Sequence, residues 1–500
     1  MKQQRKKLGL VLGAGAARGF AHIGVIQSFL EHGLPIDVLT GTSMGALLGG
    51  VYATGTDINY IADFSQNVAV SRFLDFSLKD GGIVRGRKVE ALMRVLTGNK
   101  SIEQLSIPFA CAAINVQTGQ VEVFKRGGLY GHYDDAERFA FFSRAVVEAP
   151  DQLGWHPDVI HCNDWQTALV PVYLLEDKYR IPQLANTRTV FTIHNIEYQG
   201  RYGDQVLQDV IGLDKSYFNE GMLAYFGDVN LMKGAILASN FVTTVSPTYA
   251  QELRTPFYAH GLDGVINQQS GKVQGILNGI DMDLYNPATN SGLAANFTAD
   301  NPGEGKLACK LALQRAVGLQ EDGDVPIIAC ISRLVGHKGF SLVTDALHEI
   351  MAMNVQMVVL GTGDWQYEAA FREAQVQYPG RFAAQITYSA PLSTMIYAGA
   401  DIFLMPSVSE PCGLSQMIAM RYGTVPVVRE TGGLKDTVYP YNKFTGTGRG
   451  FTFADINAND MLWVIREAVD LYFNNKEAWS GLQHEGMTAD FSWNNSAQQY

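Results

Sequence analysis

The sequence predicts an α/β fold built on parallel sheets, because short apolar runs alternate with amphipathic stretches almost throughout the chain. Continuous Val- and Ile-rich runs of strand length suit parallel strands that helices cover on both faces. Glycine-rich or polar turns follow most of these runs, and Ser246-Pro247 then supplies a helix cap and first residue. The predicted strands lie at 37–41, 158–164, 189–195, 240–246, 326–332, 355–361, 401–407 and 425–430.

Length and composition suit a cytoplasmic globular protein of several domains. The 500 residues are 47% apolar and 17% charged, which leaves room for about three domains with buried cores. A net charge of −11, without a basic stretch beyond the N-terminus, argues against nucleic acid as a main partner. Five scattered cysteines without CxxC spacing indicate a reducing cytosol and argue against a disulfide framework or a zinc site.

The N-terminal letters MKQQRKKLGLVLGAGAA imitate a secretory signal. Their apolar run is short, however, and it is interrupted by glycines that have another use. No uninterrupted apolar stretch reaches the ~20 residues that a membrane span requires. We therefore expect no transmembrane segment.

A GxSxG element at residues 41–45 gives the first candidate chemistry. A predicted strand precedes it and a helix-like stretch follows, so its glycines permit the sharp turn that exposes the oxygen of Ser43. The glycine-rich stretch upstream also follows a strand, and we expect its amides to hold a developing oxyanion. The residues of that loop are Gly13, Gly15, Arg18 and Gly19. A dinucleotide fingerprint is the alternative, but Arg18 occupies its third glycine position.

Together with the later run IPFACAAINVQTGQVEVFKRG, these motifs make residues 1–127 resemble bacterial patatin-like phospholipases. The resemblance implies Ser43 as nucleophile and a lipid or acyl ester as substrate. That family's partner aspartate lies in a D-G-G/A motif after the middle strands, whereas Asp80-Gly81-Gly82 precedes them. His22 and His32 lie on a helix-like segment, where surface or packing roles suit them. A serine without a general base is a poor nucleophile, so we expect the hydrolase part to be catalytically inactive.

From Gly128 the sequence changes character, and four long motifs carry a second resemblance. The motifs are HCNDWQTALVPVYLL, FTIHNIEYQGRYG, ISRLVGHKG and SEPCGLSQMIAMRYG. Residues 128–500 resemble bacterial glycogen synthases and plant starch synthases, which build α-1,4-glucan from ADP-glucose. The expected fold is a partial patatin-like α/β hydrolase segment followed by a two-lobe, Rossmann-like GT-B glycosyltransferase with an incomplete first lobe. The expected domains are 1–127, 128–323 with a linker near Pro287–Asp324, and 324–500.

Several residues of this second part suit a donor-sugar site on chemical grounds. A diphosphate leaving group needs fixed positive charge, which Arg333 and Lys338 supply just beyond a strand. Glu410 also follows a strand and is placed to accept hydrogen bonds from sugar hydroxyls. Glycine turns after strands allow backbone amides to approach phosphate. The residues of those turns are Gly361, Gly363, Thr431, Gly432 and Gly433.

The resemblance assigns further roles. It implies that Tyr388 stacks on the adenine, that His194 approaches the reacting glucose, and that Asp164 and Asn278 complete the sugar-side set. Cys412, beside Glu410, is interpreted as a packing residue. The second glutamate of related transferases is replaced by Ile418, so Gln416 is a candidate for the ribose contact. No metal is implied, because the sequence has no acidic pair or His cluster at ligand spacing. No cofactor is expected either, since the resemblance makes ADP-glucose the donor substrate.

The opening of the second part departs from its family. These synthases begin with a strand and a K-T-G-G-L loop that contacts the donor, and no such segment is present in the sequence. We therefore expect a first-lobe sheet whose edge is exposed or covered by foreign structure. Three hypotheses remain open: a retaining glucosyltransferase with compromised activity, a serine acyl hydrolase, and a silent fusion that binds nucleotide or glucan.

Overall fold

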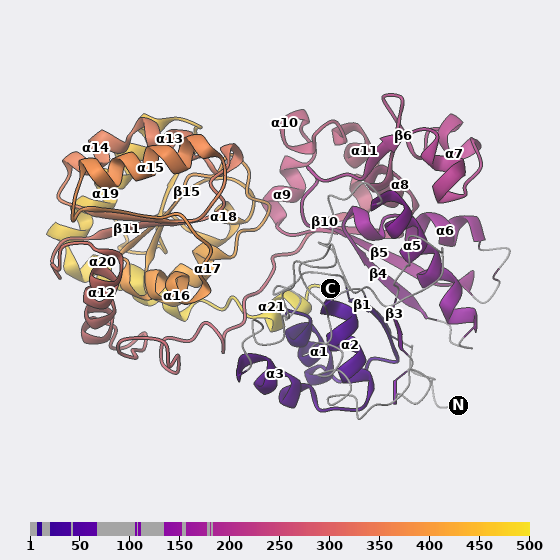
Figure 1. Ribbon diagram of the computed structural model, residues 1–500, viewed down its shortest axis with the longest axis horizontal. Coiled ribbons are helices and arrows are strands. Elements are labelled where there is room, and N and C mark those ends of the chain that lie inside the picture. The colour runs from indigo at the N-terminus through magenta and orange to yellow at the C-terminus, as the bar shows by residue number, and fades with distance from the viewer. Residues whose placement is uncertain are drawn as a thin grey trace, which may run out of the picture. The chain divides into compact units, whose positions relative to one another are not determined.

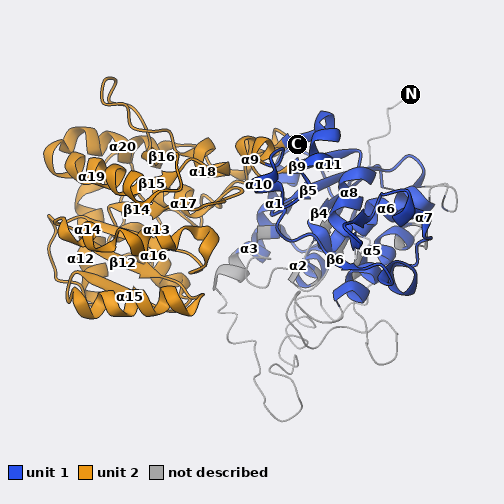
Figure 2. Ribbon diagram, turned by 90° about the horizontal axis from the view of Figure 1, so that it is seen from above, with its two compact units in different colours: residues 1–243, 253–274 blue, residues 244–252, 275–500 orange. Residues whose placement is uncertain are grey.

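The computed structural model describes residues 8–12, 21–41, 44–67, 106–107, 109–111, 135–152, 157–177, 181 and 184–500. The chain forms two compact units, which Figure 2 distinguishes by colour. Unit 1 comprises residues 1–243 and 253–274, and unit 2 comprises residues 244–252 and 275–500. These units are defined by compactness, whereas the domain boundaries at 127/128 and 323/324 come from sequence resemblance and stay predictions.

Unit 1 is built on a seven-stranded sheet with the strand order β10-β9-β5-β4-β1-β2-β3. Its strands are β1 (Leu8–Leu12), β2 (Val38–Gly41), β3 (Phe109–Cys111), β4 (Val159–Asn163), β5 (Arg188–Ile193), β9 (Phe241–Thr244) and β10 (Val273–Gly275). Its longer helices are α1 (Ala21–Glu31), α2 (Met44–Ala53), α3 (Ile58–Asn67), α5 (Asp135–Gln152), α6 (Leu169–Asp177) and α8 (Leu231–Ala238). The neighbours from β3 to β5 pair in parallel, as the apolar runs predict.

The patatin-like part of the chain supplies three strands of this sheet. β1 pairs in parallel with β4, with Leu8 opposite Val159 and Gly9 opposite Ile160. Helices α1 and α2 pack on these strands around a core cluster that includes Leu12, Ile26 and Leu39. Figure 1 shows this part in indigo beside β4. The edge of β4 is therefore covered by strands from the part of the chain that resembles patatin-like phospholipases.

A small antiparallel sheet extends unit 1. Its order is β6-β8-β7, made of β6 (Arg201–Gly203), β7 (Ala224–Tyr225) and β8 (Asp228–Asn230). Three short helices complete the unit: α7 (Ser216–Asn219), α10 (Pro256–Ala259) and α11 (Asp263–Gln268). Asn230 caps α8 by accepting a hydrogen bond from the backbone N–H of Lys233 at 2.9 Å.

Unit 2 contains a six-stranded parallel sheet with the order β13-β12-β11-β14-β15-β16. Its strands are β11 (Ile327–Ile331), β12 (Gln356–Leu360), β13 (Phe382–Gln385), β14 (Ile402–Met405), β15 (Val425–Arg429) and β16 (Phe451–Phe453). Its helices are α9 (Pro247–Glu252), α12 (Gly303–Val317), α13 (Phe340–Asp345), α14 (Leu347–Ala352), α15 (Trp365–Gln377), α16 (Ala390–Gly399), α17 (Ser415–Arg421), α18 (Gly432–Thr437), α19 (Ala458–Asn474), α20 (Lys476–Thr488) and α21 (Trp493–Ala497). Figure 1 shows α13, α14, α15 and α19 on one face of the sheet and α12, α16 and α17 on the other.

Both faces of β11, β12 and β14 are covered, so these strands are buried along their whole length or nearly so. This arrangement explains why their sequences are continuously apolar rather than alternating.

The segment 287–324, suggested by its composition as a linker, lies wholly within unit 2. Its helix α12 packs against α16 and carries two buried lysines. Lys310 forms a 2.9 Å ion pair with Asp401, and Lys306 donates to the carbonyl oxygen of Tyr422 at 3.1 Å. The chain instead passes between the two units after residues 243, 252 and 274.

Candidate functional site

In unit 1, two predicted sugar-side residues lie at the carboxyl ends of neighbouring strands. Asp164 follows β4 and His194 follows β5, and the backbone N–H of His194 donates to Oδ1 of Asp164 at 2.8 Å. Nε2 of His194 lies 3.0 Å from Oδ1 of Asn163. Asp164 has a φ of +56°, which is a strained conformation for a residue other than glycine. The structure therefore brings Asp164 and His194 into contact, and their roles toward a sugar stay predictions.

The electrostatics of this strand edge differ from those of exposed residues. Burial raises the pKa of Asp164, and the neighbouring His194 lowers it to a smaller extent. Burial, followed by His194, lowers the pKa of His161 to about 4. His161 lies 2.6 Å from the hydroxyl of Thr192, which in turn lies 2.6 Å from the hydroxyl of Thr243. Sequence reasoning missed His161, although it stands two residues before Asn163 on the same strand.

The setting of the GxSxG element is partly described. β2 ends at Gly41 and α2 begins at Met44, so the strand–turn–helix context is present. The oxyanion-loop residues Gly13, Gly15, Arg18 and Gly19, the nucleophile Ser43 and the alternative base Asp80 lie outside the described residues. Leu12 pairs with Gly41, and continuation of the β1–β4 register brings Leu12 level with Asn163. β1 and β2 therefore end at the edge of the sheet where Asp164 and His194 lie.

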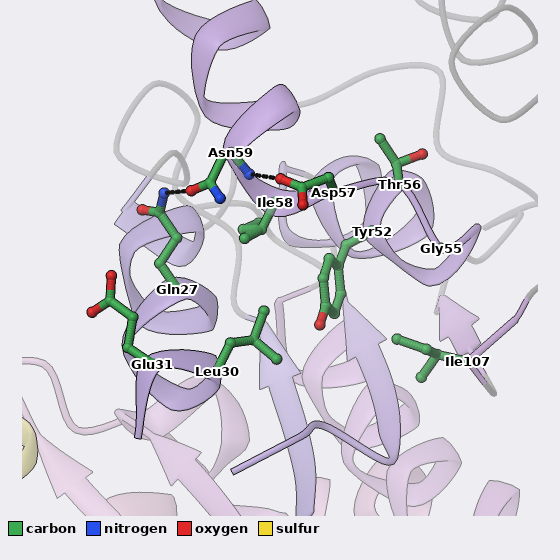
Figure 3. A pocket seen from close by; sticks show the side chains of 10 residues that line it. All are labelled: Gln27, Leu30, Glu31, Tyr52, Gly55, Thr56, Asp57, Ile58, Asn59 and Ile107. Atoms are coloured by element: carbon green, nitrogen blue, oxygen red, sulfur yellow. Dashed lines mark hydrogen bonds between the residues drawn. The ribbon is translucent and has the colours of Figure 1, made fainter. Parts of the chain in front are cut away.

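The patatin-like part also has a pocket of about 340 Å³, shown in Figure 3. It is lined by Gln27, Leu30, Glu31, Tyr52, Gly55, Thr56, Asp57, Ile58, Asn59 and Ile107. Its polar groups bond to one another, since Gln27 donates to Asn59 at 2.8 Å and the N–H of Asn59 donates to Asp57 at 2.7 Å. The pocket includes Tyr52 near the C-terminal end of α2 and Gly55 and Thr56 beyond it, whereas the GxSxG element precedes the start of this helix in the sequence.

In unit 2, Lys338 and Glu410 come together as the centre of a charged cluster. Nζ of Lys338 lies 2.7 Å from Oε2 of Glu410, and the hydroxyl of Ser407 donates to the same oxygen at 3.0 Å. The Lys338 side chain is 17% exposed and that of Glu410 is 9% exposed. The mostly buried ammonium group of Lys338 beside the buried carboxylate of Glu410 presents one positive group and several hydrogen-bond acceptor positions to a ligand.

Local sequence explains why this cluster forms. Gly339 has a φ of +75°, and a Cβ on it would lie 1.9 Å from the carbonyl oxygen of Pro406. Only glycine therefore lets the turn that carries Lys338 reach the loop after β14. Arg429, which is buried, donates to the carbonyl oxygens of Ser407 at 2.8 Å and Val408 at 2.6 Å. Hydrogen bonds from the end of β15 therefore also stabilise the loop after β14.

The glycine turns that were predicted to approach phosphate have hydrogen-bond acceptors within the chain. The N–H groups of Gly361 and Gly363 donate to the Gln385 carbonyl at 3.1 Å and the Glu368 carboxylate at 3.1 Å. The N–H groups of Gly432 and Gly433 donate to the Glu252 carboxylate at 3.0 Å and the Glu410 carbonyl at 3.2 Å. These four amides already have protein acceptors, so they do not present free donors to phosphate.

Close backbone approach is what these turns require. A Cβ on Gly361 would lie 1.8 Å from the carbonyl oxygen of Ser332, and one on Gly432 would lie 2.1 Å from that of Glu410. The turns therefore hold the Arg333 segment and the Glu410 loop in place, and Thr431 is buried with them.

The remaining predicted residues of unit 2 fall into exposed and buried groups. Arg333 is exposed two residues after β11, and Tyr388 is 85% exposed after β13. The backbone N–H of Asn278 bonds to the thiol of Cys412, so it lies beside the Glu410 loop. Burial raises the pKa of Cys412 to about 12, which fits the packing role expected for it.

Gln416 is fully buried, and its side-chain nitrogen bonds to backbone carbonyl groups. Its Nε2 group donates to the carbonyl oxygens of Cys412 at 3.1 Å and Gly413 at 3.0 Å. Its Oε1 atom is buried without a hydrogen-bond partner among the described residues, so the ribose contact suggested for Gln416 stays a prediction. Ile418 is also buried.

Sequence reasoning missed the residues that fix the second glycine turn. Glu252 accepts hydrogen bonds from the hydroxyl of Thr431 at 2.8 Å and the N–H of Gly432 at 3.0 Å. Asp436 accepts from the hydroxyl and the N–H of Thr248 at 2.6 and 2.8 Å. Glu252 stands five residues after Pro247 of the predicted helix cap, and a carboxylate at that position gave no chemical signal by itself.

The described ranges contain no group of three or more His, Cys, Asp or Glu residues placed to hold a metal ion. Within the same part of the chain, none of the helices has the length and apolar character needed to cross a membrane.

Three family models match the chain. Residues 93–268 match the starch synthase catalytic domain, and residues 316–480 match the glycosyl transferases group 1. Residues 10–154 match the patatin-like phospholipase model, so two of the matches overlap from 93 to 154. The patatin-like resemblance of the N-terminal part is confirmed, whereas the seam at 127/128 and the missing segment stay predictions.

Individual relatives and solved structures agree with the second part of the chain. A glycogen synthase of Geobacillus thermodenitrificans is 50% identical over 378 residues, which are 75% of this chain and 77% of that protein. The catalytic domain of starch synthase IV from Arabidopsis thaliana, bound to ADP and acarbose, is 41% identical with a TM-score of 0.70, covering 75% of this chain and 78% of that one. A sucrose-phosphate synthase of Thermosynechococcus elongatus, 16% identical with a TM-score of 0.53, covers 99% of this chain and 97% of that one and shows the fold alone. The chain is a GT-B glycosyltransferase and belongs to the glycogen synthase family.

Proposed function

We propose that this chain transfers glucose from ADP-glucose to an α-1,4-glucan with retention of configuration at the sugar. The cluster of Lys338, Glu410 and Ser407 carries the proposal, because it supplies a cation for a diphosphate and acceptors for sugar hydroxyls within one loop system. The similar starch synthase IV was solved with ADP and acarbose, which supports a nucleotide and a glucan-like ligand.

The proposed chemistry needs no nucleophile from the protein. Arg333 and Lys338 stabilise the charge that builds up on the departing ADP, while the glucan hydroxyl forms the new bond to glucose from the same face. Glu410 holds sugar hydroxyls and fixes the position of Lys338. Cys412 is unsuited to covalent catalysis, because burial raises the pKa of its thiol to about 12. Tyr388, with its exposed ring, is proposed to stack on the adenine.

His194 and Asp164 are the residues of unit 1 that we propose to take part in the reaction. The carboxylate of Asp164 fixes the backbone of His194, so the imidazole is oriented at the strand edge. We propose that His194 contacts the reacting glucose and that Asn278, beside the Glu410 loop, contributes a further sugar contact.

The rate of transfer is expected to be low. In the glycogen and starch synthases that this chain resembles, a K-T-G-G-L loop contacts the donor. The residues of β1 to β3 do not include this motif. Loss of one preorganised donor to a developing charge costs about 10² to 10³ in rate.

Incorporation of labelled glucose from ADP-glucose into glycogen tests the proposal, with calorimetry of ADP binding beside it. Lys338→Ala should abolish incorporation and weaken ADP binding at least tenfold, because one such charge contact contributes about 1.4 kcal/mol or more. Lys443→Ala, which removes an exposed cation elsewhere in unit 2, is the matched control. A parent chain without ADP affinity would contradict the proposal, as would a Lys338→Ala variant that behaves like the control.

A serine acyl hydrolase acting on lipid or acyl esters is the second candidate. The patatin-like match over residues 10–154 and the strand–turn–helix context around Ser43 favour it. We expect an organophosphonate probe to label Ser43 slowly or not at all, because no working base has been identified. Rapid labelling that is lost in Asp80→Asn would promote this candidate.

We also propose a cytoplasmic location, which the buried free thiols of Cys162, Cys309, Cys330 and Cys412 support.

A further inference from the structure

The turn between β7 and β8 carries an aromatic residue in a conformation that aromatic residues avoid. Tyr225 pairs with Asp228, so Phe226 and Gly227 form a two-residue hairpin loop. Their φ angles are +49° and +90°, the pattern of a type I′ turn, which favours Asn-Gly or Gly-Gly. Phe226 is nevertheless 87% exposed, so no core packing compensates for this strain. A strained residue whose ring is not buried in a core points to a function at the position.

The base beneath Phe226 is rigid. The Tyr225 hydroxyl donates to the carbonyl oxygen of His260 at 2.8 Å, and a Cβ on Gly261 would meet that hydroxyl at 2.0 Å. The Arg201 guanidinium lies over the Tyr225 ring, 4.7 Å from its centre. The rings of Tyr225 and Phe226 are 4.7 Å apart at 81°. Phe226 therefore stands edge-on to a fixed ring, which lowers the entropy that it would lose on binding a ligand.

Polar groups flank the exposed ring. Arg201 and Asp228 form a 2.8 Å ion pair, and their side chains are 46% and 42% exposed. This pair keeps unused donors on the guanidinium and unused acceptors on the carboxylate. The hairpin tip therefore offers a flat apolar ring with hydrogen-bonding groups of both kinds beside it.

We propose that the β7–β8 tip is a secondary binding site for an α-glucan chain, with one glucose ring stacked on Phe226 and hydroxyls bonded to Arg201 and Asp228. A glucose ring has an apolar face of C–H groups and a rim of hydroxyls, each of which is both donor and acceptor. The tip matches both features. The site rests on the proposed function, in which a long glucan is the acceptor, and it adds a contact that retains the polymer.

The same features disfavour other occupants. Insertion into a lipid surface would remove water from the exposed Arg201–Asp228 pair, which is costly for ions. A protein partner requires roughly 800 Å² on each side, whereas the strained element here is a single exposed side chain.

Glycogen affinity electrophoresis and sedimentation with glycogen test the site in the full chain. Phe226→Ala should weaken glycogen binding about tenfold, because it removes the flat ring on which the glucose ring stacks. Phe226→Tyr and Phe226→Trp, which keep a flat ring, should retain binding. Phe241→Ala removes another half-exposed phenylalanine of unit 1 and serves as the control.

Phe226→Asn separates binding from folding. Asparagine is preferred at this position of a type I′ turn, so the thermal midpoint of this variant should rise while its glycogen affinity falls about tenfold. Equal glycogen affinity in the parent and Phe226→Asn would overturn the proposal. So would a Phe226-dependent association with a second copy or with phosphatidylglycerol vesicles in place of glycogen.

Glucose transfer by the parent to maltotriose is measured separately, because it reports on the proposed function. Transfer without Phe226-dependent glycogen binding defeats only the secondary site. Phe226-dependent glycogen binding without transfer defeats only the proposed function.

Discussion

At the scale of single residues, Gly339 shows how one backbone position shapes the candidate site. Its positive φ and its 1.9 Å approach to the Pro406 carbonyl place Lys338 beside Glu410. We expect Gly339→Ala to lower the free energy of unfolding by about 3 kcal/mol, since strain and a backbone clash add. Gly318→Ala, with φ +78° and open space around it, should lower it by only about 1 kcal/mol. Denaturant unfolding measures both, and equal losses would contradict the close-contact argument.

His161 should make stability dependent on pH. Its pKa is lowered to about 4 in the folded chain from an ordinary value of 6.5, so the unfolded chain binds more protons between these values. The stabilising contribution is therefore complete above pH 6.5 and is lost as the pH falls toward 4. At pH 5 the loss should be about 2 kcal/mol.

Unfolding of unit 1 at pH 7 and pH 5 checks this prediction. In His161→Gln the difference between the two pH values should shrink by that amount, whereas in His348→Gln, which changes an exposed histidine, it should persist. An unchanged difference in His161→Gln would assign the effect to other groups.

Residue types were easier to predict than residue partners. The motifs identified Lys338 and Glu410, and the structure brings them together. The amides of the glycine turns were assigned to phosphate, because a glycine turn after a strand usually signals free donors. Three of the four acceptors, at Glu252, Gln385 and Glu410, lie more than 20 residues away in sequence, so the sequence held no sign that these amides were occupied.

At the scale of elements, α9 is the support of the second glycine turn. Glu252→Ala would leave the Thr431 hydroxyl and the Gly432 N–H without this acceptor, and each lost bond at a buried donor costs about 1–3 kcal/mol. We expect unit 2 to lose about 2–4 kcal/mol of unfolding free energy and the Glu410 loop to lose its fixed position. Glu252→Gln keeps an acceptor oxygen and should restore most of the loss. Hydrogen exchange of residues 431–433 provides the measurement, and equal effects of Ala and Gln would argue against the acceptor role.

Strands were predicted where their apolar runs were continuous. β4, β5, β11, β12, β14 and β15 all lie inside the predicted ranges or within one residue of them. β13 and β16 were missed because they are short and include Ala, Gln or Thr at positions where a buried core run would show Val or Ile. The β6–β8–β7 sheet was missed because its strands have two or three residues each.

At the scale of the whole molecule, the patatin-like strands are part of the first sheet. Deletion of residues 1–127 should expose the edge of β4 and the apolar surfaces that α1 and α2 cover, so the shortened chain should aggregate. Size-exclusion chromatography and light scattering of the two chains measure this outcome. A monomeric, folded deletion variant would show that the β1–β4 pairing contributes little.

The β1–β4 pairing has a consequence for the design of parallel sheets. A parallel ladder is made of main-chain groups, so the hydrogen bonds at the edge of β4 depend on the direction and spacing of the neighbouring strand, while its side chains serve the packing of the core. Any right-handed βαβ unit that arrives with the proper pitch is an acceptable neighbour there. Rossmann-type sheets are therefore open to recombination at a strand edge, and protein engineers can use such an edge as a junction between unrelated families.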